Sequence, residues 1–147
     1  MNTPADKILK YTYRLNEIDR MARRILDEVP PGVWFFDAPM GAGKTTLIGR
    51  LIARLTGEPF LGSPTFSLVH EYRMHDGRPV FHWDLYRIKD AEELLAAGFE
   101  EYLDDAAYVF VEWPALAEVF VESPIRFLLR PDENRPDLRQ LEIRLPE

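Results

Sequence analysis

Apolar and polar residues alternate along the first segment of the chain. From residue 8 to residue 15 the apolar side chains fall on one face, which predicts a half-exposed β-strand near the edge of a sheet. From residue 18 to residue 29 the apolar positions recur every three or four residues, which predicts a helix. Asn16 is a suitable N-cap for this helix, and the Pro-Pro-Gly sequence at 30–32 ends it.

The next segment is the one around which the chain is organised. An apolar, aromatic run at 33–36 predicts a buried strand, and apolar positions at helical spacing from 47 to 55 predict a helix that Gly57 ends. A loop with two glycines joins the two, and Lys44 and Thr45 follow it. A strand, a glycine-containing loop, Lys-Thr and a helix form the context of a phosphate-binding P-loop.

The residue types of this loop suit the chemistry of nucleotide phosphates. Glycine at 41 and 43 lets successive backbone N–H groups face an anion, and the following helix directs the positive end of its dipole to the same point. The first glycine of the usual G-x-x-x-x-G-K-[ST] pattern is Ala38 here, which is acceptable at a strand end with negative φ. We expect the phosphate to be bound by Gly41, Ala42, Gly43, Lys44, Thr45 and Thr46.

A hairpin is predicted after the P-loop helix. Residues 66–73 and 79–84 alternate in polarity, and Asp76-Gly77 between them is a strong turn signal. In an antiparallel hairpin the start of the first strand lies beside the end of the second, so Thr65 and Asp84 should be neighbours. Nucleotide switches use this arrangement, with the threonine on the Mg²⁺–γ-phosphate side and the aspartate at the metal's water shell.

A second buried strand is predicted at 108–111, where the chain is continuously apolar. It ends in Glu112, at the edge of the sheet where α/β folds bind ligands. Glu112 would orient the attacking water or support Mg²⁺, and a salt-bridged strand end is the alternative. With a helix from Asp90 and two further strands at 125–130 and 138–145, we expect one α/β domain over residues 1–147, P-loop NTPase-like, in three layers with a mixed parallel and antiparallel sheet.

Composition and charge narrow the class of protein. The chain has 147 residues, no cysteine and no apolar run of membrane-spanning length, so we expect a soluble cytoplasmic protein. The net charge of −7 argues against a protein whose whole surface binds nucleic acid. Residues 90–105 carry seven acids and no base, which indicates a solvated face or an acidic docking surface for a partner.

Four separated motifs together resemble one family. They are residues 38–46, Ser63-Pro64-Thr65-Phe66, the H-x-D-x-Y-R block at 82–87, and Glu112-Trp113. In this order they resemble the TsaE (YjeE-type) family of small bacterial P-loop ATPases, which act in the N6-threonylcarbamoyladenosine modification of tRNA. The resemblance spans about residues 10 to 125. Ala38 departs from the family's usual glycine, and the final hairpin carries no family signal.

The resemblance implies ATP and Mg²⁺ as ligands and slow, partner-gated hydrolysis. The implied partners are the threonylcarbamoyl-transferase subunit and that subunit's inactive paralogue, through which tRNA would be reached indirectly. The implied catalytic residues are Glu112, Asp84 and Lys44. The implied metal-binding residues are Thr45, Asp84 and Glu112. Thr65 would belong to the switch-like loop, while the residues shaping the site would be His82, Tyr86, Arg87 and Trp113. For His82, a packed core residue is as good an interpretation as a catalytic one.

Three other functions share a P-loop. A small-molecule kinase usually carries an arginine in a lid, and the acidic segment 89–105 has none. A GTP switch normally has an Asn-Lys-x-Asp sequence, which does not occur here. A non-hydrolysing, nucleotide-sensing scaffold would not need the carboxylates of Asp84 and Glu112 for its function.

Overall fold

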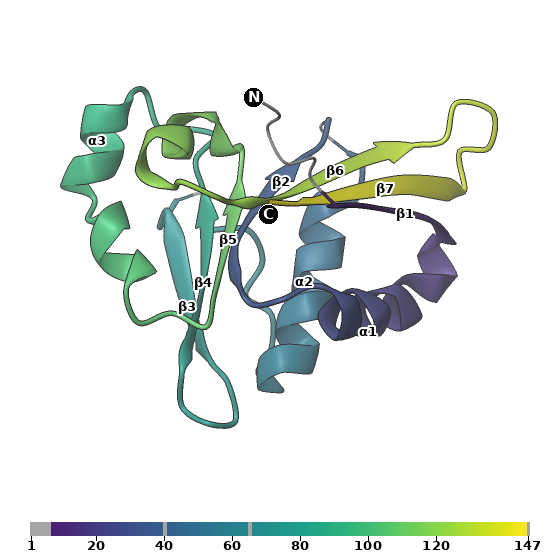
Figure 1. The fold of residues 1–147 in the computed structure, drawn as a ribbon, viewed down its shortest axis with the longest axis horizontal. Coiled ribbons are helices and arrows are strands. Elements are labelled where there is room, and N and C mark those ends of the chain that lie inside the picture. The colour runs from purple at the N-terminus through teal and green to yellow at the C-terminus, as the bar shows by residue number, and fades with distance from the viewer. Residues whose placement is uncertain (1–6, 40, 65, 147) are drawn as a thin grey trace, which may run out of the picture.

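The computed structural model describes residues 7–39, 41–64 and 66–146, and Figure 1 shows their arrangement. A seven-stranded sheet has the order β1-β7-β6-β2-β5-β4-β3. Its strands are β1 (Lys7–Arg14), β2 (Gly32–Asp37), β3 (Val69–Arg73), β4 (Pro79–Asp84), β5 (Tyr108–Glu112), β6 (Ile125–Pro131) and β7 (Leu138–Leu145). The helices are α1 (Ile18–Glu28), α2 (Lys44–Thr56), α3 (Ala91–Ala96) and the 3₁₀ segments η1 (Leu15–Glu17), η2 (Phe99–Leu103) and η3 (Pro114–Phe120).

The sheet is mixed, as expected. Strands β2, β5 and β4 are parallel neighbours, and β6 pairs parallel with β2 on its other side. The pairs β1–β7, β6–β7 and β3–β4 are antiparallel. Strand β1 forms one edge of the sheet, which confirms the position predicted from its alternating pattern.

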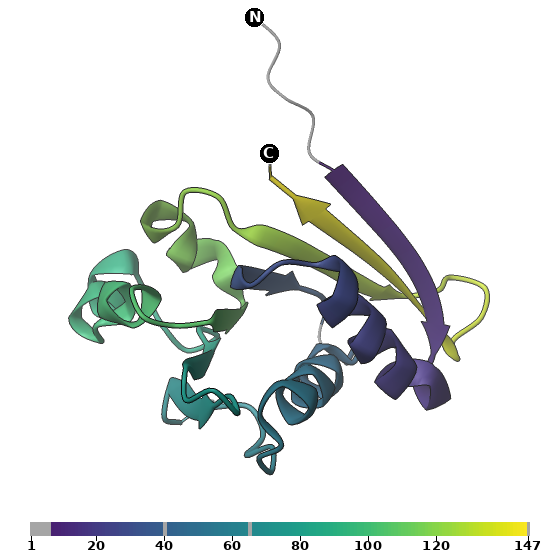
Figure 2. The same ribbon diagram turned by 60° about the horizontal axis from the view of Figure 1, so that its bottom comes forward.

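Two hydrophobic cores lie on the two faces of the sheet, so the fold has three layers. Trp34 and Phe36 of β2 belong to the core beneath α1 and α2, where the Trp34 ring stacks on Phe127 with centroids 4.8 Å apart. Phe35, between them in sequence, points to the other core with Trp83. Helix α3, η2 and η3 cover that second face, as Figure 2 shows on the side of the sheet away from α1 and α2.

The start of α1 differs from the expectation. Asn16 lies inside η1 and does not cap the helix, and no side chain caps α1, which begins at Ile18. The chain turns directly from β1 into the 3₁₀ segment, so residue 16 is already in a helical turn. The Glu17 carboxylate instead accepts a hydrogen bond from the Arg14 N–H at 2.9 Å.

The predicted hairpin is present. Strands β3 and β4 pair antiparallel, and the turn is closed by the Asp76 carboxylate, which accepts from the Arg78 N–H at 3.0 Å. The register brings Leu68 beside Asp84, whose N–H donates to the Leu68 carbonyl at 3.0 Å. Thr65, predicted as the other neighbour of Asp84, lies outside the described residues.

The parallel strands carry their last residues to one edge of the sheet. Phe36 of β2 and Asp84 of β4 both pair with Glu112 at the end of β5. The loop that leaves β2 for α2 therefore starts beside two carboxylates that are far away in sequence. Among the residues that the structure describes, no helix is both long and apolar enough to cross a membrane.

Candidate nucleotide-binding site

The loop between β2 and α2 has the backbone of a phosphate cradle. Gly41 and Gly43 adopt left-handed φ values of 81° and 92°, which side chains disfavour. The Ala42 N–H donates to the Pro39 carbonyl at 3.2 Å and closes a tight turn. Ala38 has no such positive φ, so alanine is tolerated at the position of the missing glycine.

The start of α2 supplies further donors. The Leu47 N–H bonds to the Gly43 carbonyl at 3.0 Å, so the amides of Lys44, Thr45 and Thr46 precede the helical hydrogen-bond ladder. Such amides, together with the helix dipole, favour an anion. Lys44, Thr45 and Thr46 line a cavity of about 420 Å³. The other residues that line it are Pro39, Gly41, Ala42, Gly43, Ser63, Asp84, Tyr86, Glu112 and Trp113.

Lys44 lies against an aromatic ring in this cavity. Its Nζ is 3.5 Å from the centroid of the Trp113 ring and 3.5 Å from the Ala38 carbonyl oxygen. Burial lowers the pKa of the Lys44 ammonium, and the carboxylates of Glu112 and Asp84 oppose that shift. A bound phosphate would favour the charged form in the same way as these carboxylates do.

Trp113 reaches this position through a strained backbone. Its φ of 57° and ψ of 60° are left-handed, a conformation that costs a bulky residue about 1 to 3 kcal/mol. The ring of Tyr86, 5.1 Å away, packs against the indole on the exposed side. The strain places the indole over the P-loop lysine directly after Glu112.

Glu112 is the most enclosed polar group of the site. Its Oε1 accepts from the Thr45 hydroxyl at 2.9 Å, and its Oε2 lies 2.6 Å from Nε2 of His82. The Ser63 hydroxyl is 3.4 Å from the same Oε2. The carboxylate is therefore held from three sides, and His82 is both a core residue and a contact of the site.

Asp84 is linked to Glu112 through Ser63. The Ser63 hydroxyl donates to Oδ2 of Asp84 at 2.5 Å, while Oδ1 accepts from the Tyr86 N–H at 3.0 Å. Sequence reasoning did not select Ser63 as a site residue. The available signal was that Ser63 is the first residue of the Ser-Pro-Thr-Phe motif, where Pro64 restricts the backbone of the residue before it.

The donor set fits Mg²⁺. The Thr45 and Ser63 hydroxyls and the carboxylates of Asp84 and Glu112 are hard oxygen ligands in one cavity. Among the described residues no group of three or more His, Cys, Asp and Glu side chains is suited to hold a metal ion by itself. Magnesium bound through one or two carboxylates and substrate phosphates needs no such cage.

The structure does not bring two of the residues implied by the resemblance into the described lining of this cavity. Thr65 lies outside the described residues. Arg87 does not line the cavity, because its guanidinium packs over the ring of Phe66 at 4.7 Å from the centroid. Phe66 itself is 87% exposed.

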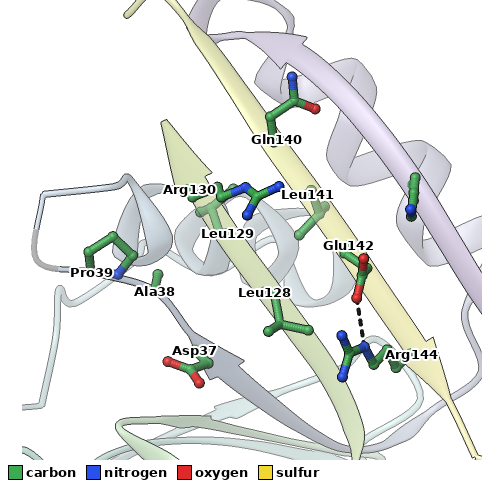
Figure 3. Close-up of a pocket in the computed structure, with 11 residues that line it drawn as sticks. Asp37, Ala38, Pro39, Leu128, Leu129, Arg130, Gln140, Leu141, Glu142 and Arg144 are labelled. Carbon is green, nitrogen blue, oxygen red and sulfur yellow. Dashed lines mark hydrogen bonds and ion pairs between the residues drawn. The ribbon is translucent and has the colours of Figure 1, made fainter. Parts of the chain in front are cut away.

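A second hollow, of about 340 Å³, lies beside the end of β2 on the surface of β6 and β7 (Figure 3). It shares Pro39 with the P-loop cavity. The Glu142 carboxylate there is bonded to the Arg144 guanidinium at 2.6 Å. The first residues of α2 and Glu112 line the other cavity and not this hollow, so the P-loop cavity is the candidate phosphate site.

Comparisons with known proteins identify the family of the chain. A sequence model of the family described as threonylcarbamoyl adenosine biosynthesis protein TsaE matches residues 12–140. The tRNA threonylcarbamoyladenosine biosynthesis protein TsaE of Haemophilus influenzae is 35% identical over 79 residues, which are 54% of this chain and 49% of that protein. Its namesake from Bacillus subtilis is 37% identical over 90 residues (60% and 54%), and that of Rickettsia felis is 30% identical over 111 residues (74% and 64%).

A solved structure shares the fold. The crystal structure of Bacillus subtilis YdiB superposes with a TM-score of 0.75 at 24% identity and covers 99% of this chain and 90% of its own. The three sequence relatives are matched over only 49% to 64% of their length. The family match nevertheless runs from residue 12 to residue 140, and the chain therefore belongs to the TsaE family of threonylcarbamoyl adenosine biosynthesis proteins.

Proposed function

We propose that this protein is a Mg²⁺-dependent ATPase required for the N6-threonylcarbamoyladenosine modification of tRNA. The observation that carries the ATPase proposal is the 2.9 Å hydrogen bond from the Thr45 hydroxyl to the Glu112 carboxylate. It joins the P-loop threonine to an acid at the end of the neighbouring parallel strand. P-loop NTPases hold Mg²⁺ between a threonine or serine and an acid in these two places.

Each side chain has a role in this proposal. Lys44 and the amides of residues 41–46 bind the β- and γ-phosphates, and Thr45 with Glu112 holds Mg²⁺, which would neutralise phosphate charge when bound. Asp84 would support Mg²⁺ through its bound water, and Thr65 would belong to the loop that senses the γ-phosphate. Glu112 orients the water that attacks the γ-phosphorus. The bond from phosphorus to the bridging oxygen breaks, the proton of the water passes to the released phosphate or to solvent, and ADP and inorganic phosphate leave.

The partners in this proposal are the threonylcarbamoyl-transferase subunit and its inactive paralogue in the cytoplasm, with tRNA bound by that complex. Residues 1–147 act as one ATPase domain that resets the complex between rounds of modification. The names of the relatives, which place them in threonylcarbamoyladenosine biosynthesis, support this pathway. The docking surface we propose is the acidic segment 90–105, where Glu92, Glu93, Glu100 and Glu101 are all exposed.

The deciding experiment follows the γ-phosphate of labelled ATP with the protein alone and with the transferase pair and tRNA. Slow release of phosphate to water that changes when the partners are added supports the proposal. Transfer of phosphate to a small acceptor supports a kinase, and tight ATP binding without turnover supports a nucleotide-sensing scaffold.

Variants separate binding from turnover in that assay. Lys44→Ala removes the cation at the phosphates and should lose nucleotide affinity. Glu112→Gln keeps an oxygen acceptor for Thr45 and should keep binding but lose about 100-fold or more in turnover. A variant with Glu92→Lys, Glu93→Lys, Glu100→Lys and Glu101→Lys should assemble more weakly with the transferase pair and keep the basal rate of hydrolysis. Unchanged assembly would remove the docking proposal.

A further inference from the structure

One side chain connects the C-terminal hairpin to the P-loop. Arg139 of β7 donates from Nε to the Ala42 carbonyl at 2.9 Å. Its Nη1 donates to the carbonyls of Pro136 at 2.7 Å and Leu138 at 3.2 Å. The guanidinium is thus bonded to the hairpin on one side and to the phosphate loop on the other.

The surroundings of Arg139 hold it in place. Tyr13 of β1 is its cross-strand partner and is buried. Burial raises the pKa of Tyr13 to about 12, and the Arg139 cation acts against that rise. Nε also lies 3.8 Å from the point that a Cβ on Gly43 would occupy. The positive charge is therefore next to the glycine that opens α2.

The contact with Ala42 has a geometric consequence for Gly43. A trans peptide is planar, so the carbonyl of one residue and the N–H of the next point in opposite directions. When Arg139 binds the Ala42 oxygen on one side of the loop, the Gly43 N–H is directed to the other side. Gly43 lines the candidate phosphate cavity and has a left-handed φ of 92°. Because glycine has no side chain, no side chain of residue 43 fixes the orientation of this peptide.

We propose that Arg139 is a positioning residue for nucleotide binding. It fixes the Ala42–Gly43 peptide with the Gly43 amide toward the phosphate, and its charge adds to the attraction for that anion. A charge-assisted hydrogen bond of this kind is stronger than a neutral one. The inference rests on the proposed function only in that the cavity binds nucleotide phosphate.

The test measures binding of a fluorescent ATP analogue with Mg²⁺ to the full chain carrying Arg139→Ala, Arg139→Lys or Arg130→Ala. Arg130 is the matched control, since it is an exposed arginine of the same hairpin and lines the other hollow (Figure 3). Arg139→Ala should weaken binding roughly 10- to 100-fold, the loss expected for one hydrogen bond from a charged donor. Arg139→Lys should recover part of that loss, because it keeps the charge without the planar fork.

Steady-state kinetics distinguish positioning from a general loss of structure. For Arg139→Ala, KM for ATP should rise by the same factor while kcat at saturation changes less than about threefold. Equal affinity in wild type and Arg139→Ala, or an equal loss in Arg130→Ala, would overturn the inference. A fall in kcat at constant KM would also overturn it. Failure of the wild-type protein to bind nucleotide would instead remove the proposed function.

Discussion

Nε2 of His82 lies 2.6 Å from Oε2 of Glu112, and the two side chains are 0% and 2% exposed. The imidazole comes from β4, two residues before Asp84, and the carboxylate from the end of β5. Because His82 occupies Oε2, Oε1 is the oxygen that meets the Thr45 hydroxyl. The histidine thus orients the acid that we propose for Mg²⁺ and hydrolysis, although it lines no part of the cavity itself.

Replacing His82 by alanine should slow ATP turnover more than it weakens nucleotide binding. Without the imidazole, Glu112 can rotate away from Thr45, and losing a hydrogen bond that orients a metal ligand typically costs 10- to 100-fold in metal affinity or activity. We expect a roughly tenfold or greater fall in kcat with the dissociation constant for Mg²⁺–ATP within about threefold. His75→Ala, in the exposed turn of the β3–β4 hairpin, is the control. An unchanged kcat in His82→Ala would show that Glu112 needs no support from the ring.

The close approach of α2 to the next loop predicts an unusual response to Gly49→Ala. A Cβ at Gly49 would lie 2.7 Å from the Phe60 ring, which stacks on His82 at a centroid distance of 5.9 Å. In a helix interior alanine is more favourable than glycine by about 1 kcal/mol, but overpacking a core typically lowers the free energy of unfolding by about 1 to 3 kcal/mol. We therefore expect a lower Tm and slower ATP turnover. The double variant Gly49→Ala/Phe60→Leu should recover Tm, and a higher Tm in the single variant would contradict the argument.

Much of the site could be predicted because it follows from strand order. Once 33–36 and 108–111 are parallel strands, the P-loop and Glu112 must lie at one edge. The Asp76-Gly77 turn likewise fixed the hairpin that ends at Asp84. The contacts of Ser63 and Arg139 could not be predicted in this way. They depend on the path of a loop and on the register of β7, and Arg139 is 97 residues from the carbonyl that it binds.

Alkaline pH should destabilise the fold through Tyr13. Burial raises its pKa from 10.0 to about 12, so above pH 10 the unfolded chain loses this proton while the folded chain keeps it. The free energy of unfolding should therefore fall between pH 10 and 12, by at most about 2.7 kcal/mol from this group. Urea titrations of wild type and Tyr13→Phe across this range should show a shallower fall in the variant. Thr12→Ala is the neighbouring control in β1, and equal slopes in wild type and Tyr13→Phe would contradict the assignment.

Trp113 should report nucleotide binding through its fluorescence. Its ring lies over the Lys44 ammonium and lines the cavity, whereas Trp34 and Trp83 are fully buried in the two cores. A bound phosphate draws the ammonium from the ring, so titration with ATP and Mg²⁺ should change the emission. Trp113→Phe should abolish that change, while Trp83→Phe, which removes an indole packed on Phe99 and Tyr102, should retain it. Binding to both variants is checked by equilibrium dialysis. If Trp113→Phe binds ATP and still shows the full emission change, the signal comes from a core tryptophan. In that case nucleotide binding must rearrange the sheet rather than the side chains above it.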